Sequence, residues 1–260
     1  MSIQKTKDEL IAHKHEAISA FENYLDSLIE SSDVQMMGKS DKICYWLKDW
    51  ARFLSYEPQF SPSHLRRYKR GEIVKVHLGF NIGSEEGGLH YAVVLDKNNS
   101  KTSPVVTIIP LTSLKPHIDV NNLKPGNVFL GNELFISLNA KVISTSKHLN
   151  DELNSLIQMS NEFPKDVDYA IFQEMKKRID DLPKEIELLN RMKKEILKMK
   201  HGSIALISQI TTISKIRIYD PRTDHDILSN IKLSNEKLNA IDAEINRIFI
   251  HEQSFTSNNE

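Results

Sequence analysis

Apolar residues near the start of the chain recur at helical spacing. Those that lie on one stripe of a helix are Leu10, Ile11, Ile18, Phe21, Leu25 and Leu28. The run Ser31-Ser32-Asp33 interrupts this pattern, and Ser40 with Asp41 supplies a plausible N-cap for a second helix. That second segment carries an aromatic face of Tyr45, Trp46, Trp50, Phe53 and Leu54. The pattern predicts two helices, paired as a hairpin, between about residues 7 and 56.

Helical spacing also decides how Trp46 and Trp50 are interpreted. Tryptophans can stack on nucleic-acid bases, but beside Phe53 and Leu54 at helical spacing they are more often core residues. We therefore expect both to be packed inside the N-terminal helical region.

The interval from Gly71 to about residue 145 has strand character. Runs rich in β-branched residues alternate with clusters of Gly, Asn, Ser and Pro, which end strands and form turns. The predicted strands are 73–80, 91–95, 105–111 and 128–138. Several short strands separated by turn signals favour a small barrel or a sandwich.

Helical periodicity returns from about residue 147 to residue 200, in a segment dense in Lys and Glu. Its apolar positions recur at spacings near three and four, at Leu182, Ile186, Leu189, Met192 and Ile196. We interpret this segment as a helical insertion, broken at Pro164 and Pro183, that forms a hairpin or a dimer seam. Strand character resumes over 203–215, and a final amphipathic helix is predicted over about 235–250.

These changes of pattern divide the chain into successive parts. They are an N-terminal helical region (1–65), the first part of a β core (66–146), the helical insertion (147–200), and the completion of the core with the closing helix (201–260). Helices and sheets in separate runs are typical of the α+β class.

The composition of the 260-residue chain is that of an ordinary folded protein, with 40% hydrophobic and 27% charged residues. Lys and Arg number 34 against 35 Asp and Glu, so no protein-wide basic field indicates a long nucleic-acid duplex as the partner. Any contact with RNA must therefore be local and short.

Cysteine usage and hydropathy bear on the compartment. The single Cys44 excludes an intramolecular disulfide and a cysteine-based zinc cluster, which fits a reducing compartment. We find no apolar run long enough to span a membrane and no apolar signal-peptide core at the N-terminus. We expect a cytoplasmic protein with no membrane partner.

The most informative stretch is 70–95, in which a polar, glycine-punctuated loop joins two strand-like runs. It begins Arg70-Gly71-Glu72, passes through the loop Gly83-Ser84-Glu85-Glu86-Gly87-Gly88, and continues as a hydrophobic strand. This stretch resembles the opening hairpin of the MazF/PemK toxins. In that family a strand after an Arg-Gly-Asp/Glu triplet leads into a Gly-Ser-Glu-Gln-Gly-Gly-like loop and a second strand.

Two further blocks resemble the same family in the same order. They are the strand 103–112 and the block 203–217, which is similar to the family's strand ending in Gln-Ile-Arg-Thr-Ile-Asp-Lys. The resemblance implies an SH3-like or CcdB-like β-barrel core, a homodimer, and a type II toxin–antitoxin endoribonuclease (an mRNA interferase). It also implies single-stranded RNA as substrate, a cognate antitoxin as partner, and no metal or other cofactor.

RNA can be cut without a cofactor because its 2′-OH can attack the adjacent phosphorus, leaving a 2′,3′-cyclic phosphate and a 5′-OH. The protein must then supply a base, donors for the charge on the non-bridging oxygens, and an acid. The resemblance assigns action on the scissile phosphate to Thr112 and to an Arg whose place is taken here by His90. A histidine changes charge near neutral pH and can both accept and donate a proton, whereas an arginine is a permanent bidentate cation.

For His90 the alternative is a simple hydrogen bond to a backbone carbonyl at the strand start. For Thr112 it is a hydroxyl that ends its strand through a local backbone bond. The loss of the arginine also favours a protein that binds RNA or an antitoxin without cutting.

Supporting roles fall to the loop and to the third block. Glu85 and Ser84 retain the loop chemistry of the family, with Glu85 as a candidate catalytic residue that orients His90 or RNA. Gly83, Gly87 and Gly88 give the loop freedom and close approach. The other candidate substrate-binding residues are Gln209, Thr211, Lys215 and Arg217, for which a solvated surface role is the alternative. The basic run 66–70 could extend an RNA groove or be merely solvated.

Three other readings stay open. The chain could be a non-catalytic barrel that binds RNA, DNA or an antitoxin, or a CcdB-like poison of another protein. The helical additions could act in cis as a built-in antitoxin, and the apolar positions over 182–196 could instead form a groove for an antitoxin. Asp224-His225-Asp226 is a weak metal-binding signal with no zinc spacing elsewhere, so we expect no metal.

Overall fold

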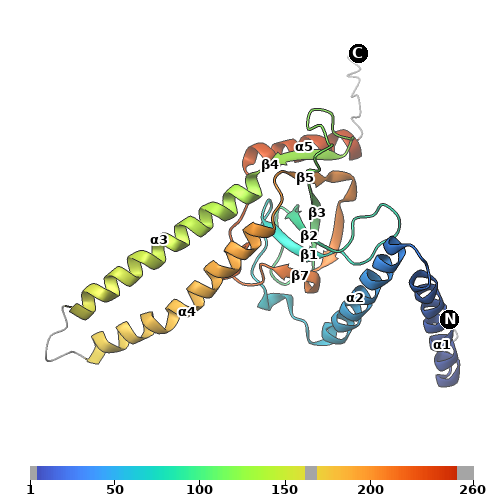
Figure 1. Ribbon diagram of the computed structural model, residues 1–260, viewed down its shortest axis with the longest axis horizontal. Coiled ribbons are helices and arrows are strands. Elements are labelled where there is room, and N and C mark those ends of the chain that lie inside the picture. Colours follow the sequence, from blue (N-terminus) through green and yellow to red (C-terminus); the bar gives the residue numbers. More distant parts are fainter. Residues whose placement is uncertain (1–4, 162–168, 251–260) are drawn as a thin grey trace, which may run out of the picture. The chain divides into compact units, whose positions relative to one another are not determined.

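A computed structural model describes residues 5–161 and 169–250 of the chain. The chain divides into two compact units (Figure 1). The first comprises 1–59 with 79–82, and the second comprises 60–78 with 83–260. Each unit is described by itself below.

The N-terminal unit is built on helices α1 (Lys7–Ile29) and α2 (Val34–Tyr56), as the periodicity predicts. Thr6 and Glu9 form a capping box at the start of α1. Asp33, in an extended conformation, caps α2 through the backbone N–H of Gln35. The N-cap predicted at Ser40 is therefore wrong: Ser40 lies inside α2 and its hydroxyl donates to the carbonyl of Met37.

The two helices contact each other through polar side chains as well as apolar ones. Lys39 donates to the hydroxyl of Tyr24 at 2.7 Å, which links α2 to α1. Trp46 is half-buried and packs against Phe53 with ring centroids 6.3 Å apart, but Trp50 is 49% exposed. The expectation that Trp50 is a core residue is wrong, because about half of the residue remains exposed to solvent.

The second unit contains an antiparallel sheet of 7 strands in the order β4-β5-β3-β2-β1-β7, with β6 also paired to β3. The strands are β1 (Ile73–His77), β2 (Leu89–Val94), β3 (Val105–Ser113), β4 (Asn127–Gly131), β5 (Ser203–Leu206), β6 (Thr211–Ser214) and β7 (Ile218–Asp220). Short 3-10 turns precede β1, at Glu57–Gln59 and Pro62–His64, and flank β6, at Ile207–Gln209 and Lys215–Arg217.

The long strand β3 organises the sheet. One edge pairs with β2, whereas the other edge pairs with β6 along its first half and with β5 along its second half. The third sequence block is thereby brought beside the first two. Among the described residues β4 and β7 do not pair with each other, so the α+β class is confirmed but the sheet is not closed into a continuous barrel.

Alternation along the strands gives the sheet two apolar faces. Ile73, Val93 and Ile109 point into one core, which α3, α4 and α5 help to form. Val74 and Ile108, one position away, point into the other core, which contains Tyr68. Burial on both faces explains why the strands are almost continuously hydrophobic.

The helical insertion is longer than the sequence pattern predicted. It consists of α3 (Glu133–Asn161) and α4 (Tyr169–Lys198), which lie side by side and extend from the sheet (Figure 1). The predicted strand 128–138 is correct only to Gly131, because Leu134, Leu138 and Val142 recur every four residues and bury one helical face in the core. Helix α4 continues through Pro183, so the predicted break there is wrong; Pro164 lies outside the described residues.

Helices α4 and α5 (Asn235–Phe249) attach to the sheet through ion pairs as well as apolar contacts. Glu195, near the end of α4, forms an ion pair with Lys75 of β1. Asp242 of α5 forms an ion pair with Arg70, just before β1. The final helix was predicted from sequence to within one residue of its observed end. Within 5–161 and 169–250 no helix is long and apolar enough to cross a membrane.

Candidate functional site

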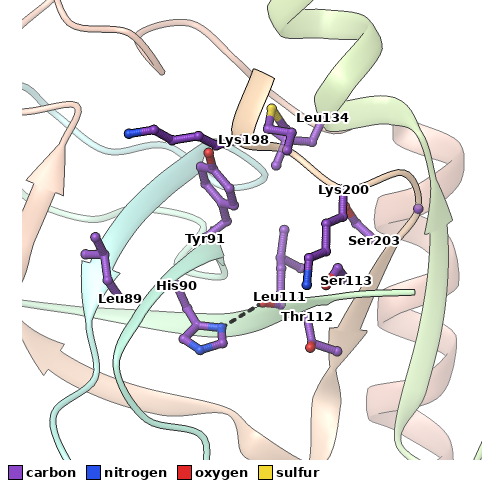
Figure 2. Close-up of a pocket in the computed structure, with 12 residues that line it drawn as sticks. Leu89, His90, Tyr91, Leu111, Thr112, Ser113, Leu134, Lys198, Lys200 and Ser203 are labelled. Atoms are coloured by element: carbon purple, nitrogen blue, oxygen red, sulfur yellow. Dashed lines mark hydrogen bonds between the residues drawn. The ribbon is translucent and has the colours of Figure 1, made fainter. Parts of the chain in front are cut away.

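A pocket of about 220 Å³ opens where β2, β3 and β5 meet the end of α4 (Figure 2). Strand residues form its floor, and the connection that follows α4 forms its rim. Its lining comprises Leu89, His90, Tyr91, Leu111, Thr112, Ser113, Leu134, Lys198, Met199, Lys200, Gly202 and Ser203. His90 and Thr112, the two residues singled out for chemistry, thus face one cavity although they are far apart in sequence.

His90 is held by both ring nitrogens. Nδ1 lies 3.1 Å from the carbonyl oxygen of Leu111, and Nε2 lies 3.1 Å from a carboxylate oxygen of Glu86. A carbonyl only accepts, so Nδ1 carries a proton in this arrangement. A neutral ring then keeps Nε2 as an acceptor, whereas a doubly protonated ring donates to Glu86. Nε2 is therefore the nitrogen at which the proton can change.

The backbone-carbonyl bond expected as the alternative for His90 does exist, because Nδ1 makes it to Leu111. This bond uses only Nδ1, so Nε2 can still exchange a proton. The His90 side chain is 25% exposed and lines the cavity. The same hydrogen bond fixes the orientation of the ring, as a bond to the second ring nitrogen commonly does for a catalytic histidine.

Gln209 ties the polar loop to the turn between β5 and β6. Its Oε1 accepts from the backbone N–H of Glu86 at 3.1 Å, and its Nε2 donates to the carbonyl of Ser84 at 3.0 Å. Gly88 closes the loop with φ of 86°, a conformation that favours glycine. The loop carboxylate that contacts His90 is consequently held by a residue from the third sequence block.

Thr112 and Ser113 end strand β3 at the pocket floor, opposite Ile204 and Ser203 of β5. Within the described part of the chain the Thr112 hydroxyl has no hydrogen-bond partner, so it does not make the local backbone bond that was its alternative role. A hydroxyl that faces a cavity without a partner is available to donate to a ligand oxygen.

Behind His90 the strand is anchored to α4. The hydroxyl of Tyr91 donates to Glu195, which also pairs with Lys75, and the Lys75 amine lies 5.3 Å from the centroid of the Tyr91 ring. Burial, reinforced by the hydrogen bond to Glu195, raises the pKa of Tyr91 far above its ordinary value. Tyr91 therefore stays protonated and acts as an anchor rather than as an acid.

The other expected site residues lie in different surroundings. Ser84 and Glu85 are exposed on the loop, and it is the next residue, Glu86, that contacts His90. Thr211 lies on β6, paired with Ile108 and outside the pocket lining. Gly87 is half-buried in the loop.

The basic residues of the third block point inward. Lys215 is 0% exposed and its amine donates to the carbonyl of Ser100 at 2.9 Å, while burial lowers its pKa. Arg217 donates to the carbonyl of His77 at 2.8 Å, and desolvation lowers its pKa as well. A phosphate could reach Lys215 only after this packing opened.

Two arginines of the basic run before β1 are paired with protein groups. Arg66, with only 6% of its side chain exposed, pairs with Glu72 and Asp224, and Arg70 donates to the carbonyl of Leu95 and pairs with Asp242. These bonds hold Arg66 and Arg70 onto the sheet, whereas Arg67 and Lys69 of the same run are exposed.

The acidic turn that carries Asp224, His225 and Asp226 is hydrogen-bonded to protein groups. Asp226 accepts from the backbone N–H groups of Arg222 and Thr223. Among the described residues no group of three or more His, Cys, Asp or Glu side chains is arranged to hold a metal ion.

Sequence reasoning missed Glu86 and the rim lysines Lys198 and Lys200. Glu85 and Glu86 are neighbouring glutamates that the sequence does not distinguish. Only the backbone path of the loop decides which carboxylate faces His90. The lysines belong to the insertion, whose distance from the loop in sequence gives no indication that its end returns to the pocket.

Comparison with known families agrees with the resemblance noted in the sequence. Residues 69–156 match the model of the PemK-like, MazF-like toxin of type II toxin-antitoxin system. The matched segment contains the hairpin, His90 and Thr112 and ends inside α3, so β5, β6 and α5 lie beyond it. No curated protein matches the chain.

Proposed function

We propose that this chain is a MazF/PemK-like toxin that cleaves single-stranded RNA without a metal, by attack of the RNA 2′-OH on the adjacent phosphorus. The single observation that carries the proposal is that His90 and Thr112, from two strands of the matched segment, face the same cavity. The sheet would then be a variant of the SH3-like or CcdB-like barrel.

His90 acts through Nε2. Nδ1 is committed to the Leu111 carbonyl, so the proton exchanged with RNA passes through Nε2, the nitrogen that faces Glu86 in the absence of substrate. Glu86 orients the ring, and the exposed Glu85 and Ser84 contact RNA from the loop. Nε2 takes the proton of the 2′-OH as the 2′-oxygen forms its bond to phosphorus. The bond from phosphorus to the 5′-oxygen then breaks, and the 5′-oxygen leaves with that proton, which Nε2 returns.

Thr112 donates its hydroxyl to a non-bridging oxygen, where negative charge grows in the transition state. Its neighbour Ser113 lines the same floor and offers a second hydroxyl. Gln209 keeps the loop in place, and Thr211, Lys215 and Arg217 support the sheet edge behind it. Base recognition then depends on the loop that carries Gly87 and Gly88.

In this proposal the toxin core comprises 66–146 and 201–260, to which the helical segments 1–65 and 147–200 are added. As for other toxins of the type, the partners would be mRNA, a second copy of the chain and a cognate antitoxin, and the compartment would be the cytoplasm. The helical additions could also restrain the toxin in cis, in which case deletion of residues 1–60 would raise toxicity.

The test is incubation of the purified protein with mixed single-stranded RNA in EDTA, with mapping of 5′ ends, beside His90→Ala. Discrete cuts with 5′-OH ends that vanish in the variant, while circular dichroism and melting temperature are unchanged, support the proposal. If the folded wild-type protein leaves RNA of every sequence intact at every pH tested, the non-catalytic alternative is favoured. The observation that supports that alternative is the presence of His90 where the family has an arginine.

A further inference from the structure

The pocket lacks a permanent cation among its strand residues. Leu89, Tyr91, Leu111, Thr112 and Ser113 are neutral, and His90 is paired with the carboxylate of Glu86. Yet a phosphate diester that enters the pocket brings a full negative charge, and more charge gathers on its non-bridging oxygens as the 2′-oxygen attacks. A cation must therefore come from the other side of the cavity.

Only Lys198 and Lys200 supply permanent positive charge among the lining residues. The two side chains point in different directions. Figure 2 shows the Lys200 side chain running down into the pocket, with its amine toward the strand segment that carries Leu111 and Thr112. The Lys198 amine points away from Thr112, over Tyr91, and its charge acts on the nearby Glu195.

The backbone around Lys200 is fixed from both sides. The Met199 N–H donates to the carbonyl of Ile196 at 3.0 Å, which extends the end of α4. Beyond Lys200, the Gly202 N–H donates to the side chain of Asn132 at 2.7 Å, and the Gly202 carbonyl accepts from Leu114 at 3.0 Å. Gly202 has φ of 77°, and a Cβ there would lie 2.8 Å from Leu114. The backbone position from which the Lys200 side chain extends is therefore constrained.

The amine itself is uncommitted. In the part of the chain that the structure describes, Lys200 makes no hydrogen bond or ion pair, although Lys75, Lys141 and Lys215 are all engaged with protein oxygens. An unpaired ammonium and an unpaired hydroxyl that line one cavity, with no carboxylate among the lining residues, are suited to an anion.

We propose that Lys200, delivered by the helical insertion, binds the scissile phosphate and supplies the positive charge that His90 cannot hold permanently. This rests on the proposed function for its chemistry, since the phosphate is that of single-stranded RNA. It gives the insertion a direct role in the site: the end of α4 completes a pocket that the matched segment leaves without its cation.

The experiment compares Lys200→Met with Lys194→Met as the matched control and Lys200→Arg as the rescue. Lys194 is exposed on α4 and does not line the pocket. Single-turnover cleavage is measured on an RNA that the wild type cuts, in EDTA. Binding is measured separately with the same sequence carrying 2′-O-methyl groups, which cannot be cut, over a series of salt concentrations. The second readout does not depend on activity.

We expect Lys200→Met to slow cleavage about 10²-fold, the effect of removing one charged or polar donor to a transition-state oxyanion. Its binding should weaken, and the slope of log K against log salt should fall by about 0.7, the value for one phosphate contact on a single strand. Lys200→Arg should restore the salt slope, and Lys194→Met should resemble the wild type in both measurements.

If the wild type cleaves RNA and Lys200→Met equals the wild type in cleavage rate, affinity and salt slope, this inference is overturned. The proposed function would then still stand. A wild type that binds but does not cut would defeat the proposed function, and the salt slope would still support or refute Lys200 as a phosphate ligand. A wild type that neither binds nor cuts would defeat both.

Discussion

Gln209 clamps the loop at Glu86 with both ends of its amide. The carbonyl oxygen accepts from the Glu86 N–H at 3.1 Å, and the amide nitrogen donates to Ser84 at 3.0 Å. These groups are more than 120 residues apart in sequence, as the first bond spans 123 positions. Since the same Glu86 contacts His90, the turn after β5 controls where the ring of His90 is held.

We therefore predict that Gln209→Ala lowers RNA cleavage about tenfold, because a loosened loop no longer holds Glu86 and His90 in one geometry. Hydrogen exchange of the backbone over 84–88 should speed up, while the melting temperature changes little. Gln209→Glu keeps an acceptor for the Glu86 N–H, but it loses the donor and adds a like charge, so it should fall below Gln209→Ala. Equal exchange rates in all three proteins would contradict the clamp.

The Thr112 hydroxyl can be tested by removal at nearly constant volume. Thr112→Val should reduce cleavage about 10²-fold, since it deletes one donor to the non-bridging oxygen, and Thr112→Ser should retain most of the rate. Stability is the control: a hydroxyl that merely ended β3 would lower the melting temperature when removed. A Thr112→Val protein that is fully active would exclude the hydroxyl from the chemistry.

Local sequence patterns were enough to predict an element when the residues within that element determine its structure. The break at 31–33, the strand starts at Ile73 and Val105 and the closing helix all follow from periodicity and turn signals. They did not suffice where tertiary contacts decide. Residues 132–138 look strand-like, but Leu134 and Leu138 bury a helical face. Pro183 is tolerated because apolar contacts on both sides hold α4 to the core.

The site shows the same division. The loop and the family resemblance led to His90 and Thr112, which share a pocket. Nothing local separates Glu85 from Glu86, and nothing local reveals that Lys215 is buried while Lys200 reaches the cavity. Those assignments depend on how the end of α4 and the block 203–217 pack against elements far earlier in the chain, which a single sequence does not encode in any short window.

Glu195 should make stability depend on acid pH. Burial raises the pKa of this carboxyl, but the hydrogen bonds from Lys75 and Tyr91 outweigh it and hold the pKa below its ordinary value of 4.5. A carboxyl with a depressed pKa stabilises the fold above its unfolded-state pKa and loses that contribution as pH falls through the folded value.

Glu195→Gln should therefore cost about 2 kcal/mol near neutral pH, the scale of hydrogen bonds to a charged group, and the difference from the wild type should shrink below pH 4.5. Urea unfolding at several pH values measures it. Glu187→Gln, at an exposed position of the same helix, is the matched control and should track the wild type throughout. A deficit that stayed constant down to acid pH would refute the electrostatic account.

Lys141 offers a stability test away from the pocket. Its amine, on α3, donates to the carbonyls of Asp226, Ile227 and Ser229, each at 2.9 Å, and burial lowers its pKa. Methionine keeps the stem but leaves these acceptors without a donor, so Lys141→Met should destabilise the fold by about 3 kcal/mol.

The exposed Lys147 lies on the same helix, and Lys147→Met should stay close to the wild type in denaturant unfolding. Lys141→Arg should recover only part of the loss, because a planar guanidinium cannot direct its donors at three converging carbonyls as an ammonium does. Since the carbonyls belong to the turn that joins β7 to α5, hydrogen exchange over 226–231 should rise in Lys141→Met before the rest of the sheet opens. Unchanged exchange there, with unchanged unfolding, would show that the three bonds contribute nothing to the fold.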